Sequence, residues 1–337
     1  MKACGLFLSL ILFCAGCATP PASDLPISRY GGPPLPDPVN FDRAGIDLIR
    51  GTFTAGRQPD GNTVVLAGAD GLIVFDTGRH AAHTQQIIDL ARARNQPVAA
   101  IVNSHWHLDH VSGNIALRSA WPGAVVYAND AALTEALGSF LARGLESNRK
   151  MLADPATPAG LADDLRGDIA TVEQGARLHP DVSIEVSRTV SIGRRRLQLN
   201  AAKAASAGDI WIYDDATGLA AAGDIVTLPA PFLDTACPRE WRAALEQILA
   251  TPFTRLIPGH GREMTRGDVT RYRDAFNALL DCADGDAPAA ACANAWAASA
   301  APLLDAQSGS QADASAYARY YVESVLRAGG TRADCPA

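Results

Sequence analysis

The sequence predicts an α/β fold, and three observations lead to this prediction. The first is a series of short β-rich runs separated by turns that contain Gly and Asp: 46–53, 62–68 and 72–76. The second is the segment 80–95, in which Ile87, Ile88 and Leu90 recur at helical spacing before 98–105 returns to a strand pattern. The third is another set of strands in the second half: 183–202, 209–215 and 218–224.

The remaining elements follow the same alternation. Residues 129–177 have a mainly helical pattern, which Pro155 and Pro158 interrupt. A helix is expected over 239–250, followed by a strand over 254–261. The tail from 266 to 329 is predicted to be helical, with an alanine-rich interruption around its cysteines.

Composition narrows the class of protein. The chain has 337 residues, 48% of them hydrophobic and 19% charged, which is enough for a large core and unlike a disordered chain. The formal net charge is −7, and Arg194–Arg196 is the only basic run, expected at a solvated strand or hairpin end. These properties argue against a nucleic-acid partner.

The N-terminus is typical of a targeting segment. Lys2 precedes an apolar run from Leu6 to Ala15 that is too short to span a membrane, so residues 1–16 are predicted to be a signal peptide. The stretch Cys14-Ala15-Gly16-Cys17 resembles a bacterial lipobox, with Cys14 where leucine is usual, which predicts lipidation of Cys17. The alternative is ordinary cleavage nearby, with Cys17 lost or left free.

Residues 17–44 are expected to contain the lipidated cysteine and a Pro/Gly-rich tether. The resemblance to lipoproteins implies export and an anchor in the outer membrane, facing the periplasm, because alanine follows Cys17. Exported proteins often contain disulfides, and four cysteines remain in the mature body. Three pairings are possible; the short loop favours Cys282 with Cys292, which leaves Cys237 with Cys335.

The octapeptide NSHWHLDH, at 103–110, contains three of the seven histidines of the chain. It follows a predicted buried strand, and such strand ends often carry functional residues. On an extended segment His105 and His107 point the same way and can bind one ion. Asp109 and His110 can face a neighbouring site. Imidazole and carboxylate ligands suit zinc, so one or two zinc ions per chain are predicted.

The same residues resemble a known family. HWHLDH resembles the signature of the metallo-β-lactamase-fold hydrolase superfamily. Asp76 in LIVFDTG, Asp224 in LAAAGD and His260 in LIPGHG resemble, in the family's order, its structural aspartate, its bridging carboxylate and its last histidine ligand. The resemblance implies a four-layer αββα sandwich over 45–265, with extra C-terminal helices over 266–337.

At one position this sequence departs from the family's pattern of metal ligands. In the stretch Ala204-Ala205-Ser206-Ala207-Gly208-Asp209, Ala205 stands where the family usually has a third histidine of the first metal site. The first site would keep His105 and His107, with or without Asp224, while the second would keep Asp109, His110, Asp224 and His260. Three interpretations stay open: one zinc in the second site, two ions with the first held more weakly, or a degenerate protein that binds a ligand without turnover.

The histidines His80, His83 and His179 could substitute for the missing ligand, but each is more simply explained as a surface or capping residue. The resemblance implies an exported zinc-dependent hydrolase that uses a metal-activated water on an ester, thioester, lactone or lactam carbonyl of a small molecule, with Asp109 as the catalytic residue. The alternative is a catalytically degenerate lipoprotein that binds a ligand or a partner. Walls of the pocket are expected from three segments: 57–60, 79–80 and 129–177.

Overall fold

The protein is described here from a computed structural model, which places residues 39–40, 45–54, 56–328 and 335. The predicted signal peptide, Cys17 and nearly all of the predicted tether lie outside these residues. From the tether only Val39–Asn40 is placed, as a short strand paired with the next one. Within the described part, no helix combines the length and apolar character needed to cross a bilayer.

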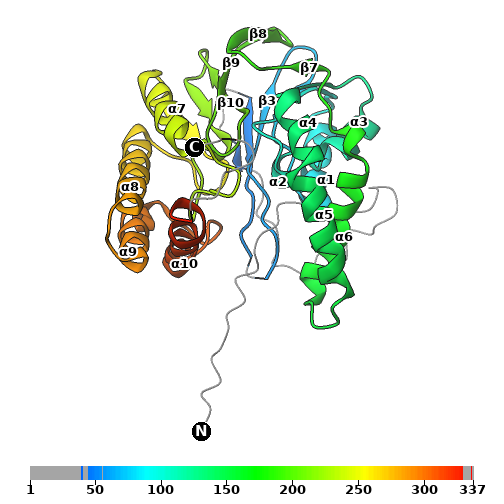
Figure 1. Cartoon of the computed structure of the whole chain (residues 1–337). Helices are drawn as coiled ribbons and strands as arrows, with labels where there is room; N and C mark the ends of the chain where they lie inside the picture. Colours follow the sequence, from blue (N-terminus) through cyan, green and yellow to red (C-terminus); the bar gives the residue numbers. More distant parts are fainter. Residues whose placement is uncertain (1–38, 41–44, 55, 329–334, 336–337) are drawn as a thin grey trace.

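Two β-sheets form the centre of the molecule (Figure 1). The first sheet is antiparallel from β1 to β4 and parallel from β4 to β7. Its strands, in spatial order, are β1 (Val39–Asn40), β2 (Ile46–Ile49), β3 (Thr63–Ala67), β4 (Leu72–Phe75), β5 (Val98–Val102), β6 (Val125–Ala128) and β7 (Val182–Ser183).

The second sheet comes from the second half of the chain. Its strands, in spatial order, are β12 (Arg255–Ile257), β11 (Leu219–Ala221), β10 (Asp209–Asp214), β9 (Arg195–Ala202) and β8 (Arg188–Ile192). Only β11 and β12 of these pair in parallel. The predicted basic run lies at the β8–β9 hairpin, where Gly193 and Arg194 have positive φ angles of 53° and 62°.

Helices cover both outer faces (Figure 1). The helices of the first half are α1 (Ala81–Ala93), α2 (Leu108–Val111), α3 (Asn114–Ala120), α4 (Asp130–Gly138), α5 (Phe140–Ala153) and α6 (Ala159–Glu173). Those of the second half are α7 (Pro238–Ala250), α8 (Arg266–Asp284), α9 (Ala289–Ala300) and α10 (Gln311–Tyr321). Figure 1 shows the first group on one side of the sheets and the second group on the other.

The apolar residues of β3 explain this layering. Val64 and Leu66 belong to the core between the two sheets, whereas Val65 packs in the core under α1. Because both faces of the strand are covered, its sequence is a continuous apolar run rather than an alternating one. A third core joins the second sheet to α7–α10. The predicted four-layer αββα sandwich with extra C-terminal helices is thus confirmed.

The prediction for the C-terminal tail was wrong in one detail. The alanine-rich stretch is not an interruption but helix α9, which contains Cys292. Alanine has the highest intrinsic helix propensity, and Ala293, Ala297 and Ala300 are buried against neighbouring helices. The break between α8 and α9 is confined to 285–288.

The four cysteines of the body lie in two pairs in the structure. Cys282 is bonded to Cys292, with their Cα atoms 5.6 Å apart, and this bond joins α8 to α9. Cys237 is bonded to Cys335, with a Cα separation of 5.3 Å. The second bond attaches the end of the chain to the residue that immediately precedes α7.

Candidate metal centre

All six predicted metal ligands follow the carboxyl ends of three strands. The octapeptide follows β5, Asp224 follows β11, and His260 follows β12. Parallel neighbours bring their carboxyl ends to one edge of a sheet, which is where α/β proteins commonly bind ligands. The chain therefore brings side chains from both of its halves to one place.

The six ligands form two adjacent groups. His105, His107 and Asp224 offer ligand atoms that all lie within 4.8 Å of one another. Asp109, His110 and His260 do the same within the same limit. The first group contains the residues predicted for the first site with Asp224 included, and the second group contains three of the four residues predicted for the second site.

Asp224 lies between the two groups. Its Oδ2 atom is 4.0 Å from His105 Nε2, while its Oδ1 atom is 3.3 Å from His110 Nε2 and 3.6 Å from His260 Nε2. Close approach of the loop that carries His260 requires glycine, because a Cβ atom on Gly259 would lie 2.0 Å from Asp224 Oδ1. The carboxylate is thus placed to contact ions in both groups.

Neighbouring hydrogen bonds determine the tautomers of two histidines. Ser104 Oγ donates its single hydrogen to Asp76 Oδ2 at 2.7 Å, so it must accept a hydrogen bond from His105 Nδ1 at 2.9 Å. His110 Nδ1 donates to the same carboxylate at 2.8 Å. Both imidazoles therefore carry a hydrogen on Nδ1 and present Nε2 to the site.

In His107 the hydrogen-bonded nitrogen is Nε2 rather than Nδ1, and its partner is Thr235. The Thr235 hydroxyl donates to the carbonyl oxygen of Ala205 at 2.8 Å, so it accepts from His107 Nε2 at 2.9 Å. This leaves Nδ1 of His107 with its lone pair directed away from Thr235. Sequence reasoning missed Thr235, which lies in a loop without a recognisable motif.

Unpartnered polar atoms test whether a metal fits. Among the described residues, His105 Nε2, His110 Nε2 and Asp224 Oδ1 are buried and have no hydrogen-bond partner. Such atoms cost free energy unless something compensates them. A divalent cation would satisfy all three, so the donor set fits zinc or a similar ion.

The electrostatics of the two groups differ. Burial and the neighbouring imidazoles hold the pKa of His105 well below its usual range, and burial lowers the pKa of His107 to about 3. Both are neutral ligands at neutral pH. Burial also lowers the pKa of His110, but the surrounding carboxylates outweigh this effect and raise it well above the usual value. The same negative field attracts a cation to the second group.

Asp109 is oriented from two sides. Its Oδ2 atom is 3.0 Å from His260 Nε2, and its Oδ1 atom is 3.5 Å from Arg79 Nη2. Burial raises its pKa, but the cationic neighbours outweigh burial and hold the pKa well below its usual range. Arg79 is itself held by Asp168, whose two oxygens each lie 2.7 Å from Nη1.

The expectation of surface or capping positions holds in part for the remaining histidines, since His80 is the N-cap residue of α1. His80 and His83 are buried rather than exposed, and neither belongs to the metal-binding groups. His80 contacts Asp60 at 2.7 Å and Asp164 at 3.0 Å, and His83 bonds to Thr63 at 2.8 Å. His179 is half-buried beside Asp130, with 2.6 Å between Nδ1 and Oδ1.

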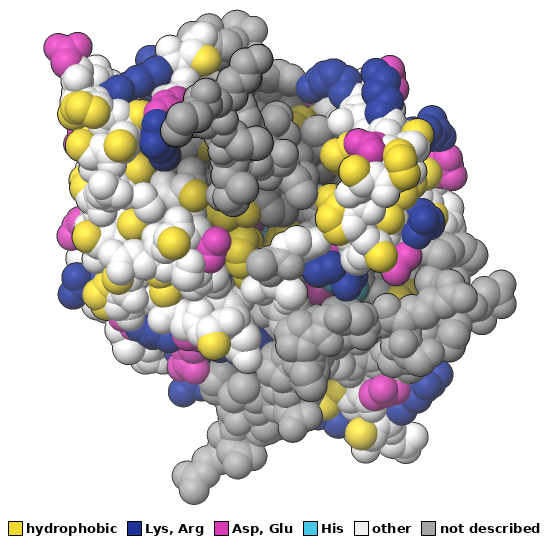
Figure 2. Space-filling model, turned by 90° about the horizontal axis from the view of Figure 1, so that it is seen from below, with side chains coloured by type: hydrophobic (Ala, Val, Ile, Leu, Met, Phe, Trp, Pro, Cys, Tyr) yellow, Lys and Arg dark blue, Asp and Glu magenta, His cyan; other side chains and the backbone are white. Residues whose placement is uncertain are grey.

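A cleft opens beside the two groups. Its lining includes His107, Asp109, Asp224 and His260, together with residues of other segments: Phe53, Gln58, Pro59, Arg79, Thr227, Pro229, Ala230, Phe232, Tyr317 and Tyr321. Of the expected segments, 57–60 contributes Gln58 and Pro59 to the lining, and 79–80 contributes Arg79 but not His80. In Figure 2, which views the molecule from below, charged side chains lie in a recess between its two sides.

The predicted contribution of 129–177 to the cleft walls was wrong. None of its residues lines the cleft. Residues of this segment instead bind arginines of the segments near the cleft. On α6, Asp164 bonds to Arg57 and Asp168 bonds to Arg79. Helix α10 contributes Tyr317 and Tyr321 to the lining instead.

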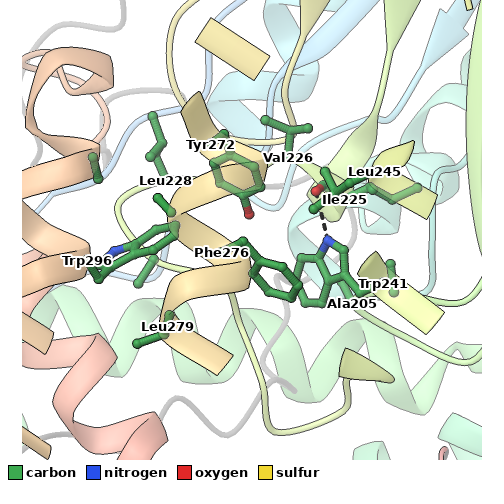
Figure 3. Packing of buried hydrophobic residues seen from close by; sticks show 14 of the residues in the cluster. Ala205, Ile225, Val226, Leu228, Trp241, Leu245, Tyr272, Phe276, Leu279 and Trp296 are labelled. Carbon is green, nitrogen blue, oxygen red and sulfur yellow. Dashed lines mark hydrogen bonds between the residues drawn. The ribbon is translucent and has the colours of Figure 1, made fainter. Parts of the chain in front are cut away.

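Ala205 itself is completely buried. It belongs to the apolar core of the second half, together with Trp241 and Phe276 (Figure 3). Figure 3 shows Trp241 donating from Nε1 to the carbonyl oxygen of Ile225, a bond of 2.9 Å. The position at which the family resemblance implies a histidine is therefore occupied by a methyl group in packed surroundings.

Comparisons with known proteins agree with this geometry. A family model described as the metallo-beta-lactamase superfamily matches residues 56–280. A metallo-beta-lactamase from Pontibacter korlensis superposes with a TM-score of 0.54 at 15% identity, covering 71% of this chain and 98% of that one. DIM-1 metallo-beta-lactamase gives 0.52 at 12% identity, with 72% and 99% covered.

A larger protein is also similar. The stereoselective inverting sec-alkylsulfatase Pisa1 from Pseudomonas sp. superposes with a TM-score of 0.56 at 18% identity, over 84% of this chain and 49% of that one. The chain thus spans about half of the sulfatase. At these identities the likeness shows the fold. Among curated proteins, none matches in a direct sequence comparison.

Proposed function

Because the chain belongs to the metallo-beta-lactamase superfamily, whose members include hydrolases, we propose that it is a zinc-dependent hydrolase of small-molecule esters, thioesters, lactones or lactams. The observation that carries the proposal is the set of unpartnered ligand atoms: buried Nε2 atoms of His105 and His110, and Oδ1 of Asp224. The first ion would be held by His105, His107 and Asp224. The second would be held by Asp109, His110, Asp224 and His260.

When bound, the metal supplies Lewis-acid polarisation of a carbonyl and lowers the pKa of a water molecule. The chain's own residues position the reaction. Asp109 is ionised and held between His260 and Arg79, so its carboxylate can accept a hydrogen bond from the attacking water. Apolar side chains, among them Phe53 and Phe232, line the cleft beside these groups.

The experiment that tests this function is a metal count beside an activity screen. The soluble part from Ala18 onward is purified without chelator, metals per chain are measured, and a panel of esters, thioesters, lactones and lactams is assayed. His110→Gln removes a proposed ligand, whereas His179→Gln replaces a histidine outside both groups. We expect bound zinc and hydrolysis, both lost in His110→Gln and kept in His179→Gln.

One observation favours a second candidate. Ala205 cannot ligate a metal and lies in packed apolar surroundings, which supports a weakened first site. The second candidate is therefore a degenerate member that binds a ligand or partner without turnover. Absence of metal after zinc has been supplied and the excess removed would contradict the hydrolase and leave this alternative.

We also propose that the protein is an exported lipoprotein of the outer membrane. The support is the N-terminal pattern of residues 1–16 and the lipobox-like stretch that ends at Cys17. Labelling with radioactive palmitate in a bacterial host tests it. Label should be incorporated into the full chain and not into Cys17→Ser.

A further inference from the structure

The cleft beside the metal-binding groups has an aromatic wall. Tyr317 and Tyr321 lie four residues apart on α10, so their side chains share one face of the helix. Phe53 meets Tyr317 with ring centroids 5.9 Å apart, and Phe232 meets Tyr321 at 6.0 Å. Both pairs are edge to face, and each joins the α/β body to the C-terminal helix.

This wall reaches the metal centre directly. The Phe232 ring lies 5.0 Å from the ring of His107, a proposed ligand. Burial and the nearby Asp234 hold the pKa of the Tyr321 hydroxyl well above its usual value, so this polar end of the wall carries no charge. A substrate with its carbonyl at the metal centre would place its remaining part against apolar ring surface.

The charged residues of the cleft also indicate which substrates it can bind. In the described part of the chain, Arg79 is the only lysine or arginine that lines the cleft. Its guanidinium contacts both oxygens of Asp168 and lies 3.5 Å from Asp109, and its Nε atom donates to the Pro59 carbonyl. This cation is compensated by protein carboxylates before any substrate arrives.

We propose that the cleft selects substrates whose non-reacting part is apolar and carries no anionic group, such as neutral esters or lactones with an aliphatic or aromatic group. This inference rests on the proposed function for the reacting carbonyl. Burial of apolar surface against the four rings favours such a group. An anionic group would lose its hydration there without gaining a cationic partner.

Two matched 4-nitrophenyl esters test the proposal on the zinc-loaded protein. They have six-carbon acyl chains that end in a methyl group (hexanoate) or a carboxylate (adipate). We expect kcat/KM for the hexanoate to exceed the value for the adipate about tenfold or more. Equal values, or a preference for the adipate, would overturn the proposal.

A substitution in the wall should redirect this preference. Tyr317→Arg introduces a cation into the aromatic wall, so adipate hydrolysis should increase about tenfold and hexanoate hydrolysis should fall. Ala312→Arg is the control, because Ala312 is exposed on the same helix outside the cleft lining. It should leave the ratio of the two esters unchanged. A similar change of this ratio in both variants would count against the proposal.

Binding without turnover separates this inference from the proposed function. Calorimetry measures the affinity of metal-free protein for hexyl 4-nitrophenyl ether and for 6-(4-nitrophenoxy)hexanoate. Tighter binding of the neutral ether, with no ester hydrolysed, would support the apolar cleft while contradicting the hydrolase. Hydrolysis without any preference for neutral substrates would contradict the cleft proposal alone. Failure of both hydrolysis and ether binding would contradict both.

Discussion

Three of the four histidines of the candidate metal centre are held by a hydrogen bond on the nitrogen that faces away from the site. For His105 and His110 the bonds lead to Asp76, through Ser104 in the first case. For His107 the partner is Thr235. Partners of this kind fix ring orientation and tautomer, so they contribute to metal affinity although they touch no ion.

Thr235 provides a first prediction at this scale. Thr235→Val removes the acceptor for His107 Nε2 and frees the ring to turn, so zinc affinity of the first group should fall about 10-fold to 100-fold. Thr235→Ser retains the hydroxyl and should bind zinc like the wild type. Metal-binding titrations of both variants check this. Equal affinity in Thr235→Val and Thr235→Ser would show that Thr235 has no positioning role.

Ala205 provides a second prediction. Ala205→His offers the missing imidazole beside His105 and His107, so bound zinc should rise from about one ion to about two per chain. The larger side chain replaces a fully buried methyl group, so the free energy of unfolding should fall by about 1–3 kcal/mol. Elemental analysis and denaturant unfolding measure the two effects.

Ala205→Leu is the control, because it adds volume without a ligand. It should lose stability and gain no zinc. If both variants hold the same amount of zinc, position 205 does not face the first group.

The proximity of the six proposed ligands could be predicted from the sequence, because each is a histidine or aspartate in a short motif that follows an apolar strand. Their partners could not be predicted in the same way. Thr235 meets His107 across 128 positions of sequence, and Asp168 meets Arg79 across 89. Such contacts depend on how whole layers pack, and neither residue belongs to a motif.

At the scale of elements, α1 and α6 are joined by buried charges. His80, which immediately precedes α1, contacts Asp60 on one nitrogen and Asp164 of α6 on the other. Burial lowers the pKa of His80, but the two carboxylates outweigh it and raise the pKa from 6.5 to about 9. The protonated ring therefore stabilises the contact between these segments.

The pH dependence of stability follows from this shift. Because folding raises the pKa of His80, its contribution is fully present below pH 6.5 and is lost as the pH rises through 9. The free energy of unfolding of metal-free protein should fall by about 3 kcal/mol over this interval. Denaturant unfolding at a series of pH values measures it. His80→Gln should lack this decrease, and an equal slope in both proteins would refute the assignment.

Strands were more predictable than the placement of helices. The runs around β2–β5 are apolar and bounded by turn residues, so their positions follow from local pattern. Residues 129–177 were correctly expected to form helices, but not where these helices lie. The sequence of an amphipathic helix indicates which of its faces is buried, but not which surface of the protein that face covers.

At the scale of the whole molecule, the C-terminal helices are part of the cleft. Arg50 pairs with Asp305 at 2.7 Å, and the backbone N–H of Phe53 donates to Gln307 at 3.1 Å. These contacts hold the segment before α10 against the first half of the chain. The family match ends at residue 280, so α9 and α10 lie beyond it. The aromatic wall is therefore partly an addition to the shared fold.

The two disulfides should contribute unequally to the stability of this arrangement. Cys237 and Cys335 are 98 positions apart, whereas Cys282 and Cys292 are 10 apart. A crosslink that closes a longer loop removes more entropy from the unfolded chain. Cys237→Ala/Cys335→Ala should lower the free energy of unfolding by about 2 kcal/mol more than Cys282→Ala/Cys292→Ala. Denaturant unfolding of both double variants measures the difference.

The longer crosslink should also affect the metal centre. Cys237 is buried, its backbone N–H donates to the Ala204 carbonyl at 2.7 Å, and it lies two residues from Thr235. Loosening this loop disturbs the hydroxyl that orients His107. Zinc affinity should therefore fall in Cys237→Ala/Cys335→Ala and stay unchanged in Cys282→Ala/Cys292→Ala, whose bond lies within the helical layer. Equal zinc affinity in the two variants would mean that the loop keeps Thr235 in place without the crosslink.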